Sequence, residues 1–183
     1  MTSKRGRSIG NILFRYIILI LVAIPNLWLF YLIFTPLTAY PVYWLLNLFY
    51  EASLLTGNIV LINNLIPIEM ISACIAGAAY YLLLILNLST PKIKLNTRIR
   101  AIVFSFLTLL LINIIRIILL SAIAVSGSSF FDATHLLFWY GISTIFVVAI
   151  WFAEIKLFKI KEIPFYSDIK FLSGKFQQTQ RKK

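Results

Sequence analysis

Long apolar runs separated by short polar segments dominate the chain. The runs cover residues 12–34, 72–88, 101–125 and 133–158. A helix needs about 20 mostly apolar residues to cross a bilayer. We therefore expect an all-α polytopic membrane protein with four transmembrane helices, the first of which is kinked at Pro25.

The segment between the first two runs, residues 40–71, has a different pattern. Residues 40–56 are apolar and aromatic but contain charged and amide side chains, which favours an external interfacial or re-entrant helix over a full span. Two short β-branched runs follow on either side of Asn63-Asn64 and predict a hairpin or irregular lid. Pro67 restricts the second of these runs to an edge strand.

Composition supports a membrane protein with a single domain. The 183 residues are 61% hydrophobic and only 13% charged, whereas a soluble domain is closer to half apolar with about a quarter of its residues charged. We interpret residues 1–158 as one transmembrane domain and residues 159–183 as a basic tail.

The basic residues are grouped rather than spread. The net charge of +11 would suggest nucleic acid in a soluble protein. Here the charges lie in blocks at 4–15, 92–100 and 156–183, next to the apolar runs, and no aromatic-basic recognition motif accompanies them. This distribution indicates membrane orientation, and we expect no nucleic-acid partner.

Every Lys and Arg except Arg116 lies in these blocks, which four spans place on one side of the membrane. The opposite side, residues 35–71 and 126–134, has acidic residues but no basic ones. The positive-inside rule therefore predicts cytoplasmic termini. A full span at 40–56 would move the 92–100 loop outside, against that rule.

Arg116 is the exception because it lies within an apolar run. A helical rise of about 1.5 Å per residue puts it roughly 24 Å beyond Arg100, in the outer part of the bilayer. A charge at that depth normally has a partner or a function. The alternative is a structural Arg that pairs with backbone carbonyls, Asp132 or Glu69. Asn113 shares its helix face and either orients it, donates a hydrogen bond itself or makes a helix–helix contact.

The single Cys and the single His are also predicted at the outer face. Cys74 lies in the first turn of the second run, where the helix end and a nearby Arg would favour the thiolate; the alternative is simple packing. Gly77 shares its helix face and would let a partner approach closely. His135 opens the fourth run as a general acid or base, or as an ordinary interfacial residue.

Thiolate, imidazole and guanidinium are the nucleophile, proton carrier and oxyanion clamp that acyl transfer needs. Serine residues near His135 leave a serine nucleophile open, although Gly and Ser there also mark a loop. One Cys and one His exclude an intrachain disulfide and make a zinc site built by this chain alone very improbable, so we expect no metal or cofactor.

Three short motifs resemble those of the exosortase/archaeosortase transpeptidases. They are Ser72-Ala-Cys74-Ile-Ala-Gly77, Asn113-Ile-Ile-Arg116-Ile117 and His135-Leu-Leu-Phe-Trp-Tyr-Gly141. The resemblance covers roughly residues 40–155. The chain has Cys-Ile-Ala-Gly where the family often has Cys-Ser-Gly, and its short length is more like that of the compact archaeal forms.

The resemblance implies a reaction and its partners. A secreted protein would carry a C-terminal motif, an apolar span and a basic cluster. Cys74 would attack near the motif outside the membrane, Arg116 would stabilise the oxyanion, and His135 would protonate the leaving amine and activate the acceptor, a membrane lipid. The 40–71 segment would cover the site and exclude water. The alternatives are an intramembrane cysteine protease with water as acceptor and a non-enzymatic binding or assembly subunit.

Overall fold

The computed structural model describes residues 9–24, 26–160, 162–166, 168–169 and 173. The helical elements are α1 (Ile9–Ala23), α2 (Trp28–Leu46), α3 (Ser72–Ile75), α4 (Gly77–Ser89), α5 (Leu95–Val125), α6 (Phe131–Leu137), the π-helical segment η1 (Phe138–Ile142) and α7 (Ser143–Phe158). The strands are β1 (Ala52–Thr56), β2 (Ile59–Ile62) and β3 (Ile66–Glu69). The chain is thus mostly helical, with one small sheet.

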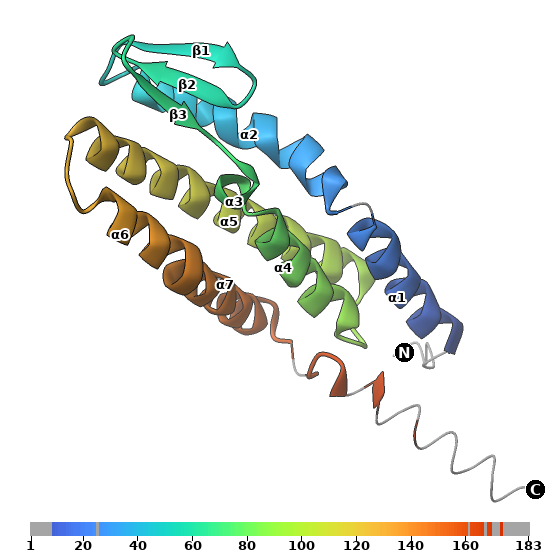
Figure 1. The fold of residues 1–183 in the computed structure, drawn as a ribbon. Helices are drawn as coiled ribbons and strands as arrows, with labels where there is room; N and C mark the ends of the chain where they lie inside the picture. The colour runs from blue at the N-terminus through green and yellow to red at the C-terminus, as the bar shows by residue number, and fades with distance from the viewer. Residues whose placement is uncertain (1–8, 25, 161, 167, 170–172, 174–183) are drawn as a thin grey trace, which may run out of the picture.

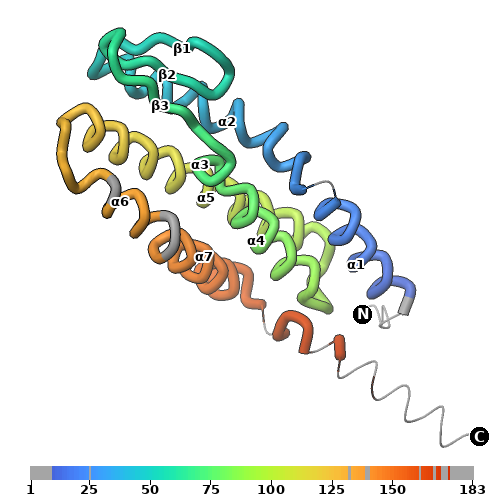
Figure 2. The backbone as a smooth tube through the Cα atoms, in the orientation of Figure 1, coloured from blue at the N-terminus to red at the C-terminus, as the bar shows by residue number. Residues whose placement is uncertain are grey.

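The helices form an elongated bundle with the sheet at one end (Figure 1). Helix α5 is central and packs against α2, α3, α4, α6 and α7. We call the end with the strands the sheet end. The opposite end, where α4 turns into α5, is the loop end, and both α1 and the chain after α7 approach it (Figure 2).

Three helical segments are long and apolar enough to cross a membrane: Trp28–Leu46, Ser72–Ser89 and Leu95–Val125. Two of these correspond to the predicted second and third spans. The predicted fourth span is helical throughout but is divided among α6, η1 and α7.

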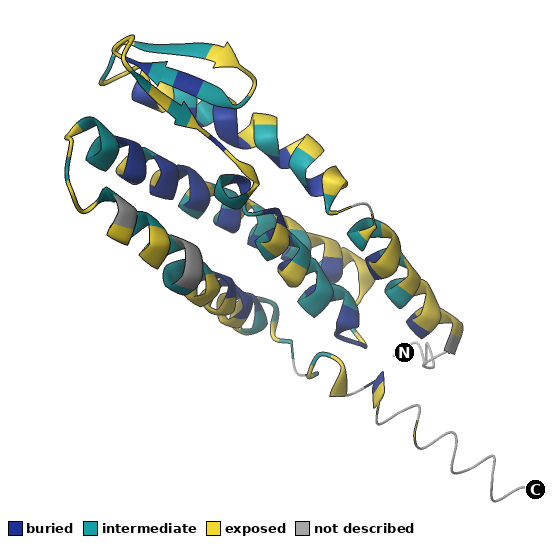
Figure 3. Cartoon of the chain, viewed as in Figure 1, coloured by how far each residue is buried: buried dark blue, intermediate teal, exposed yellow. Residues whose placement is uncertain are grey.

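Helix α5 has a buried face and an exposed apolar face (Figure 3). The exposed residues recur every four positions: Val103, Leu107, Leu111, Ile115 and Leu119. Each is at least half exposed, yet none is polar. A continuous apolar stripe facing outward is typical of a helix surrounded by lipid or by another protein.

The predicted first span, residues 12–34, is wrong in its boundaries. Helix α1 ends at Ala23 and α2 begins at Trp28, and Asn26 and Leu27 between them have positive φ angles of 51° and 59°. Two consecutive residues in this conformation end a right-handed helix. Pro25, the expected kink, lies outside the described residues.

The predicted separate helix at residues 40–56 is also wrong. Its first part continues α2, and its last part is β1. The buried residues of α2 recur every four positions and show why: Phe30, Phe34, Thr38, Val42 and Leu46. This helical spacing runs through Pro36 and Pro41 without interruption, so packing outweighs the tendency of proline to end a helix.

The predicted hairpin is confirmed as β2 and β3, with β1 added as a third strand in the order β1-β2-β3. Asn63 and Asn64 have positive φ angles of 51° and 56°, and Leu65 N–H donates to Ile62 O at 3.1 Å. A type I′ turn requires this conformation, and Asn tolerates it. Pro67 lies in an edge strand, as predicted.

Aromatic rings join α2, α4 and α5. Phe34 of α2 stacks on Tyr80 of α4 with ring centroids 3.7 Å apart, and Phe106 of α5 meets Tyr80 edge-on at 5.4 Å. Close approach of α2 to α4 depends on Gly77, because a Cβ there would lie 2.7 Å from Cε1 of Tyr31. The small residue expected on this face therefore admits a helix from the protein itself.

We expect Gly77→Ala to lower the unfolding temperature of the protein in detergent micelles, because the added methyl overlaps the Tyr31 ring. Overpacking of this kind costs about 1–3 kcal/mol. In a Tyr31→Ala background the same substitution should cost much less. An equal cost in both backgrounds would contradict this account of the helix contact.

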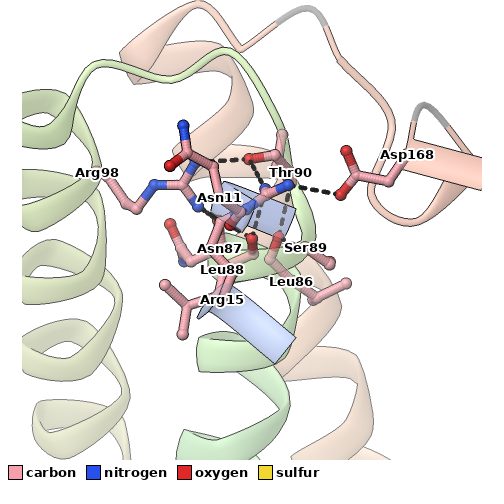
Figure 4. Close-up of polar contacts among 9 residues, drawn as sticks. All are labelled: Asn11, Arg15, Leu86, Asn87, Leu88, Ser89, Thr90, Arg98 and Asp168. Carbon is pink, nitrogen blue, oxygen red and sulfur yellow. Dashed lines mark hydrogen bonds and ion pairs between the residues drawn. The ribbon is translucent and has the colours of Figure 1, made fainter. Parts of the chain in front are cut away.

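Two arginines bind the carboxyl end of α4 at the loop end (Figure 4). Arg98 of α5 donates to backbone carbonyls of three residues: Asn87, Leu88 and Thr90. Arg15 of α1 donates to Leu88 O at 2.8 Å, to Thr90 O at 3.3 Å and to Asp168 Oδ2 at 2.7 Å. The last carbonyls of a helix have no partner within it, and these guanidinium groups supply one.

We expect the double variant Arg15→Leu/Arg98→Leu to lose more stability than the sum of the single variants. Either Arg alone still donates a hydrogen bond to Leu88 O and to Thr90 O. These two oxygens lose their donors only when both arginines are replaced. A buried carbonyl left without a donor costs about 1–3 kcal/mol. Thermal unfolding of the four proteins tests this, and additive losses would show that the two arginines act independently.

Candidate functional site

A break in the helical path positions Cys74. Ala76 adopts a left-handed conformation (φ 60°, ψ 36°), which ends α3 after one turn and begins α4 in a new direction. In a continuous helix, the carbonyls of Ala73 and Cys74 would accept bonds from the N–H groups of residues 77 and 78. The break therefore leaves these two carbonyls in need of other donors.

Side chains of α5 supply those donors. Asn113 Nδ2 donates to Cys74 O at 2.7 Å, and Arg116 Nη2 donates to Ala73 O and Cys74 O at 3.2 Å each. Both side chains are buried, with 3% and 7% of their surface exposed. Of the partners considered for Arg116 from the sequence, backbone carbonyls are the ones observed. The structure thus brings together Cys74, Asn113 and Arg116.

The other terminal nitrogen of Arg116 binds the last predicted span. Arg116 Nη1 donates to Ser143 Oγ at 2.8 Å, and Ser143 Oγ–H donates to Phe138 O at 2.6 Å. The π-helical segment η1 lies between these two residues and widens the helix by one residue, and such segments are common at functional sites. Arg116 therefore links α3, α5 and the start of α7.

The third nitrogen of Arg116, Nε, makes none of these hydrogen bonds. Nε is buried and has no hydrogen-bond partner among the described residues. A cavity of about 10 Å³ lies beside it, lined also by Ala76, Asn113 and Ser143. That volume is close to the minimum for one water molecule. The Nε–H group is thus a donor that remains for a ligand.

The Cys74 side chain is half-buried and forms no disulfide, and Arg116 binds the carbonyl oxygen of the same residue. The Cys74 N–H donates to Ile71 O at 2.8 Å, which closes the first turn of α3. Anchoring of this turn to α5 uses only backbone carbonyls, so the thiol itself has no part in it. A half-buried thiol on a turn that a buried guanidinium holds in place is a candidate nucleophile.

His135 lies apart from these anchoring contacts. It is half-buried on α6 and stacks on Phe131 with ring centroids 5.8 Å apart. It precedes Ser143 by eight residues, or roughly 12 Å along a helix. The structure thus places His135 on the helical path that contains the Arg116 partner, toward its sheet end.

A groove opens next to Cys74. It has a volume of about 670 Å³ and lies between one face of α2 and the connection from β3 to α3. Its lining includes Tyr31 and Tyr40 from α2, and Glu69 and Ser72 from the connection. Ser72 and Ile75 line the groove and Cys74 does not, so the groove borders the turn that contains Cys74 rather than the thiol itself.

Sequence reasoning missed two polar residues of the last helix. Ser143 is an ordinary hydroxyl in an apolar run, and only the bond from Arg116 distinguishes it. Glu154 carried a clearer signal, since an acid within an apolar run is costly in a membrane. Glu154 is fully buried on α7 beside Asn87 of α4. It therefore contributes to the α4–α7 interface.

Comparisons of the chain with protein-family models, with curated proteins and with solved structures gave no match.

Proposed function

We propose that this chain is a membrane cysteine transpeptidase of the exosortase/archaeosortase type. It cleaves C-terminal sorting tails of secreted proteins at the outer membrane face and transfers the new carboxyl end to an acceptor, a lipid. The observation that carries the proposal is the turn around Cys74, which Asn113 and Arg116 hold from a neighbouring helix. These contacts fix the backbone from which the Cys74 thiol would attack.

In the proposed reaction, the Cys74 thiolate attacks the scissile carbonyl and forms a tetrahedral oxyanion. Collapse of this intermediate breaks the C–N bond, His135 gives a proton to the leaving amine, and a thioester remains on Cys74. The acceptor nucleophile then loses its proton to His135 and attacks the thioester carbonyl, and the C–S bond breaks to release the Cys74 thiolate. Arg116 supplies positive charge to the thiolate and the oxyanion, and its Nε has no partner among the residues that the structure describes.

The proposal requires His135 to approach Cys74 when a tail is bound. The π-helical segment η1 separates His135 from Ser143, and a small change in its winding would tilt α6 relative to α7. Catalytic hydrogen bonds often form only in the substrate complex. Bound substrate would thus complete the catalytic group.

Charge distribution sets the proposed orientation. The basic loop end would face the cytoplasm, and the sheet end, with Cys74, would face outside. Four crossings are needed for this arrangement, made by α1 with α2, by α3 with α4, by α5, and by α6 with α7. The host would be prokaryotic, and archaeal by the compact size of the chain.

One observation favours a second candidate, a non-enzymatic membrane assembly subunit. Both terminal nitrogens of Arg116 bind the protein's own backbone and Ser143, which is what a structural Arg does. The assembly role predicts that Arg116 matters and that the Cys74 thiol does not.

The test is the C-terminal mass of secreted proteins that end in a motif, an apolar span and a basic cluster. Hosts with and without this protein are compared by mass spectrometry. We expect tails removed and a lipid adduct on the new C-terminus only when the protein is present. Removed tails with a free carboxylate would indicate a protease instead. Identical masses in both hosts would overturn the enzymatic proposal.

A further inference from the structure

Two backbone bonds just outside the strands show which residues of each strand point their N–H and C=O groups toward which neighbour. Met70 N–H donates to Asn58 O at 2.8 Å, and Asn63 N–H donates to Glu51 O at 2.7 Å. Residues of an antiparallel strand direct their backbone groups alternately to one side and the other. The even-numbered residues of β2 therefore bond to β3, and its odd-numbered residues bond to β1.

The same alternation determines which backbone groups of β3 point away from β2, at the outer edge of the sheet. Ile66 and Ile68 direct their N–H and C=O groups to β2, so Pro67 and Glu69 direct theirs away from the sheet. Pro has no N–H, and its place at an outward position costs the sheet no hydrogen bond. Glu69 offers both a donor and an acceptor, and Ile71 N–H continues the row.

This edge of β3 is open. No described residue bonds to the backbone of Glu69 or to the N–H of Ile71. The other edge of the sheet is partly covered by the chain itself, because Ala52 N–H of β1 donates to Asn47 Oδ1 at 3.3 Å. Free strand edges are templates for pairing with another extended chain.

The open edge leads directly to the nucleophile. Ile71 is the N-cap of α3, and its carbonyl accepts the N–H of Cys74. The groove between α2 and residues 69–72 begins at the same place. A strand paired with Glu69 would thus extend its chain toward α3, the turn that contains Cys74.

We propose that β3 binds an extended peptide as a fourth strand, through the backbone of Glu69 and Ile71, and that this strand is the substrate segment next to the scissile bond. The inference rests on the proposed function and adds how the substrate is held. A repeating row of donors and acceptors matches a peptide backbone, which a lipid chain lacks. The Glu69 carboxylate, exposed and in the groove, disfavours an acidic substrate side chain beside it.

The first experiment removes one outward donor from the sheet edge. Glu69→Pro deletes an N–H that points away from β2, whereas Glu69→Ala keeps it, so the pair separates backbone from side chain. We expect Glu69→Pro to slow tail removal in the host roughly tenfold relative to Glu69→Ala. The two proteins should have equal abundance and an equal rate of Cys74 alkylation by a maleimide.

Equal tail removal by Glu69→Pro and Glu69→Ala would overturn the strand-pairing proposal. The proposed function has a separate test in the Cys74→Ala variant. If Cys74→Ala blocks tail removal and Glu69→Pro does not, only the fourth strand is wrong. If Cys74→Ala leaves tail removal intact, the enzymatic proposal and the strand fail together.

A second experiment detects the strand directly. The photo-reactive residue benzoylphenylalanine is placed at position 67 on the open edge, or at position 55 in β1 as the matched control, in a Cys74→Ala background. We expect position 67 to cross-link a secreted precursor that mass spectrometry identifies with its tail intact. No adduct at position 67, or equal adducts at both positions, would overturn the proposal.

Discussion

Cys74→Ala is expected to leave tail-bearing secreted proteins uncut. Cys74 is the single cysteine of the chain, so no second thiol can replace it. Loss of a catalytic nucleophile lowers turnover at least a thousandfold. Cys74→Ser should behave similarly, because a hydroxyl in the same place is a far weaker nucleophile at neutral pH. The measurement is the size of these proteins in hosts that produce each variant.

Stability of the same variants separates chemistry from folding. Asn113 and Arg116 bind the carbonyls of Ala73 and Cys74, and both carbonyls remain in Cys74→Ala. We therefore expect the unfolding temperature in detergent to change little. Normal processing by Cys74→Ala would favour the assembly-subunit role, and a large loss of stability would show that the side chain is structural.

Arg116→Met is expected to abolish tail removal and to destabilise the protein. The substitution removes the charge near Cys74 and leaves Ala73 O without its donor, at a cost of about 1–3 kcal/mol. Arg116→Lys should rescue little, because an ammonium group cannot reach Ser143 and the α3 carbonyls at once with the geometry of a guanidinium. Thermal unfolding and processing are both measured.

Asn113→Leu is the matched control for Arg116→Met. It also removes a donor from the Cys74 carbonyl, but it keeps the positive charge and the Arg116 bond to the same oxygen. If Arg116 acts through its charge, Asn113→Leu should retain far more processing, and its loss of stability should be smaller because each carbonyl keeps a donor. Equal loss of processing by both variants would show that Arg116 serves only to hold the turn.

Local patterns predicted the features that depend on few neighbours. A turn at Asn63 and Asn64 follows from their tolerance of positive φ, and the edge position of Pro67 follows from its missing N–H. The shared face of Asn113 and Arg116 follows from their spacing on a helix in an apolar run. These features are determined by the sequence alone because backbone sterics and helical periodicity decide them.

Features that depend on packing between distant segments needed the tertiary structure. Helix α2 continues past Pro41 because its buried face meets α4 and α5. Ala76 adopts a left-handed conformation although it is not a glycine, so its residue type did not predict the break. The break at Ala76 leaves carbonyls that side chains of α5 satisfy, and Ser143 is a partner of Arg116 because α7 packs beside α5. The sequence predicted a thiol and a guanidinium near one membrane face. Only the tertiary structure shows that the guanidinium binds the backbone of Cys74, because long-range hydrogen bonds leave no local sequence pattern.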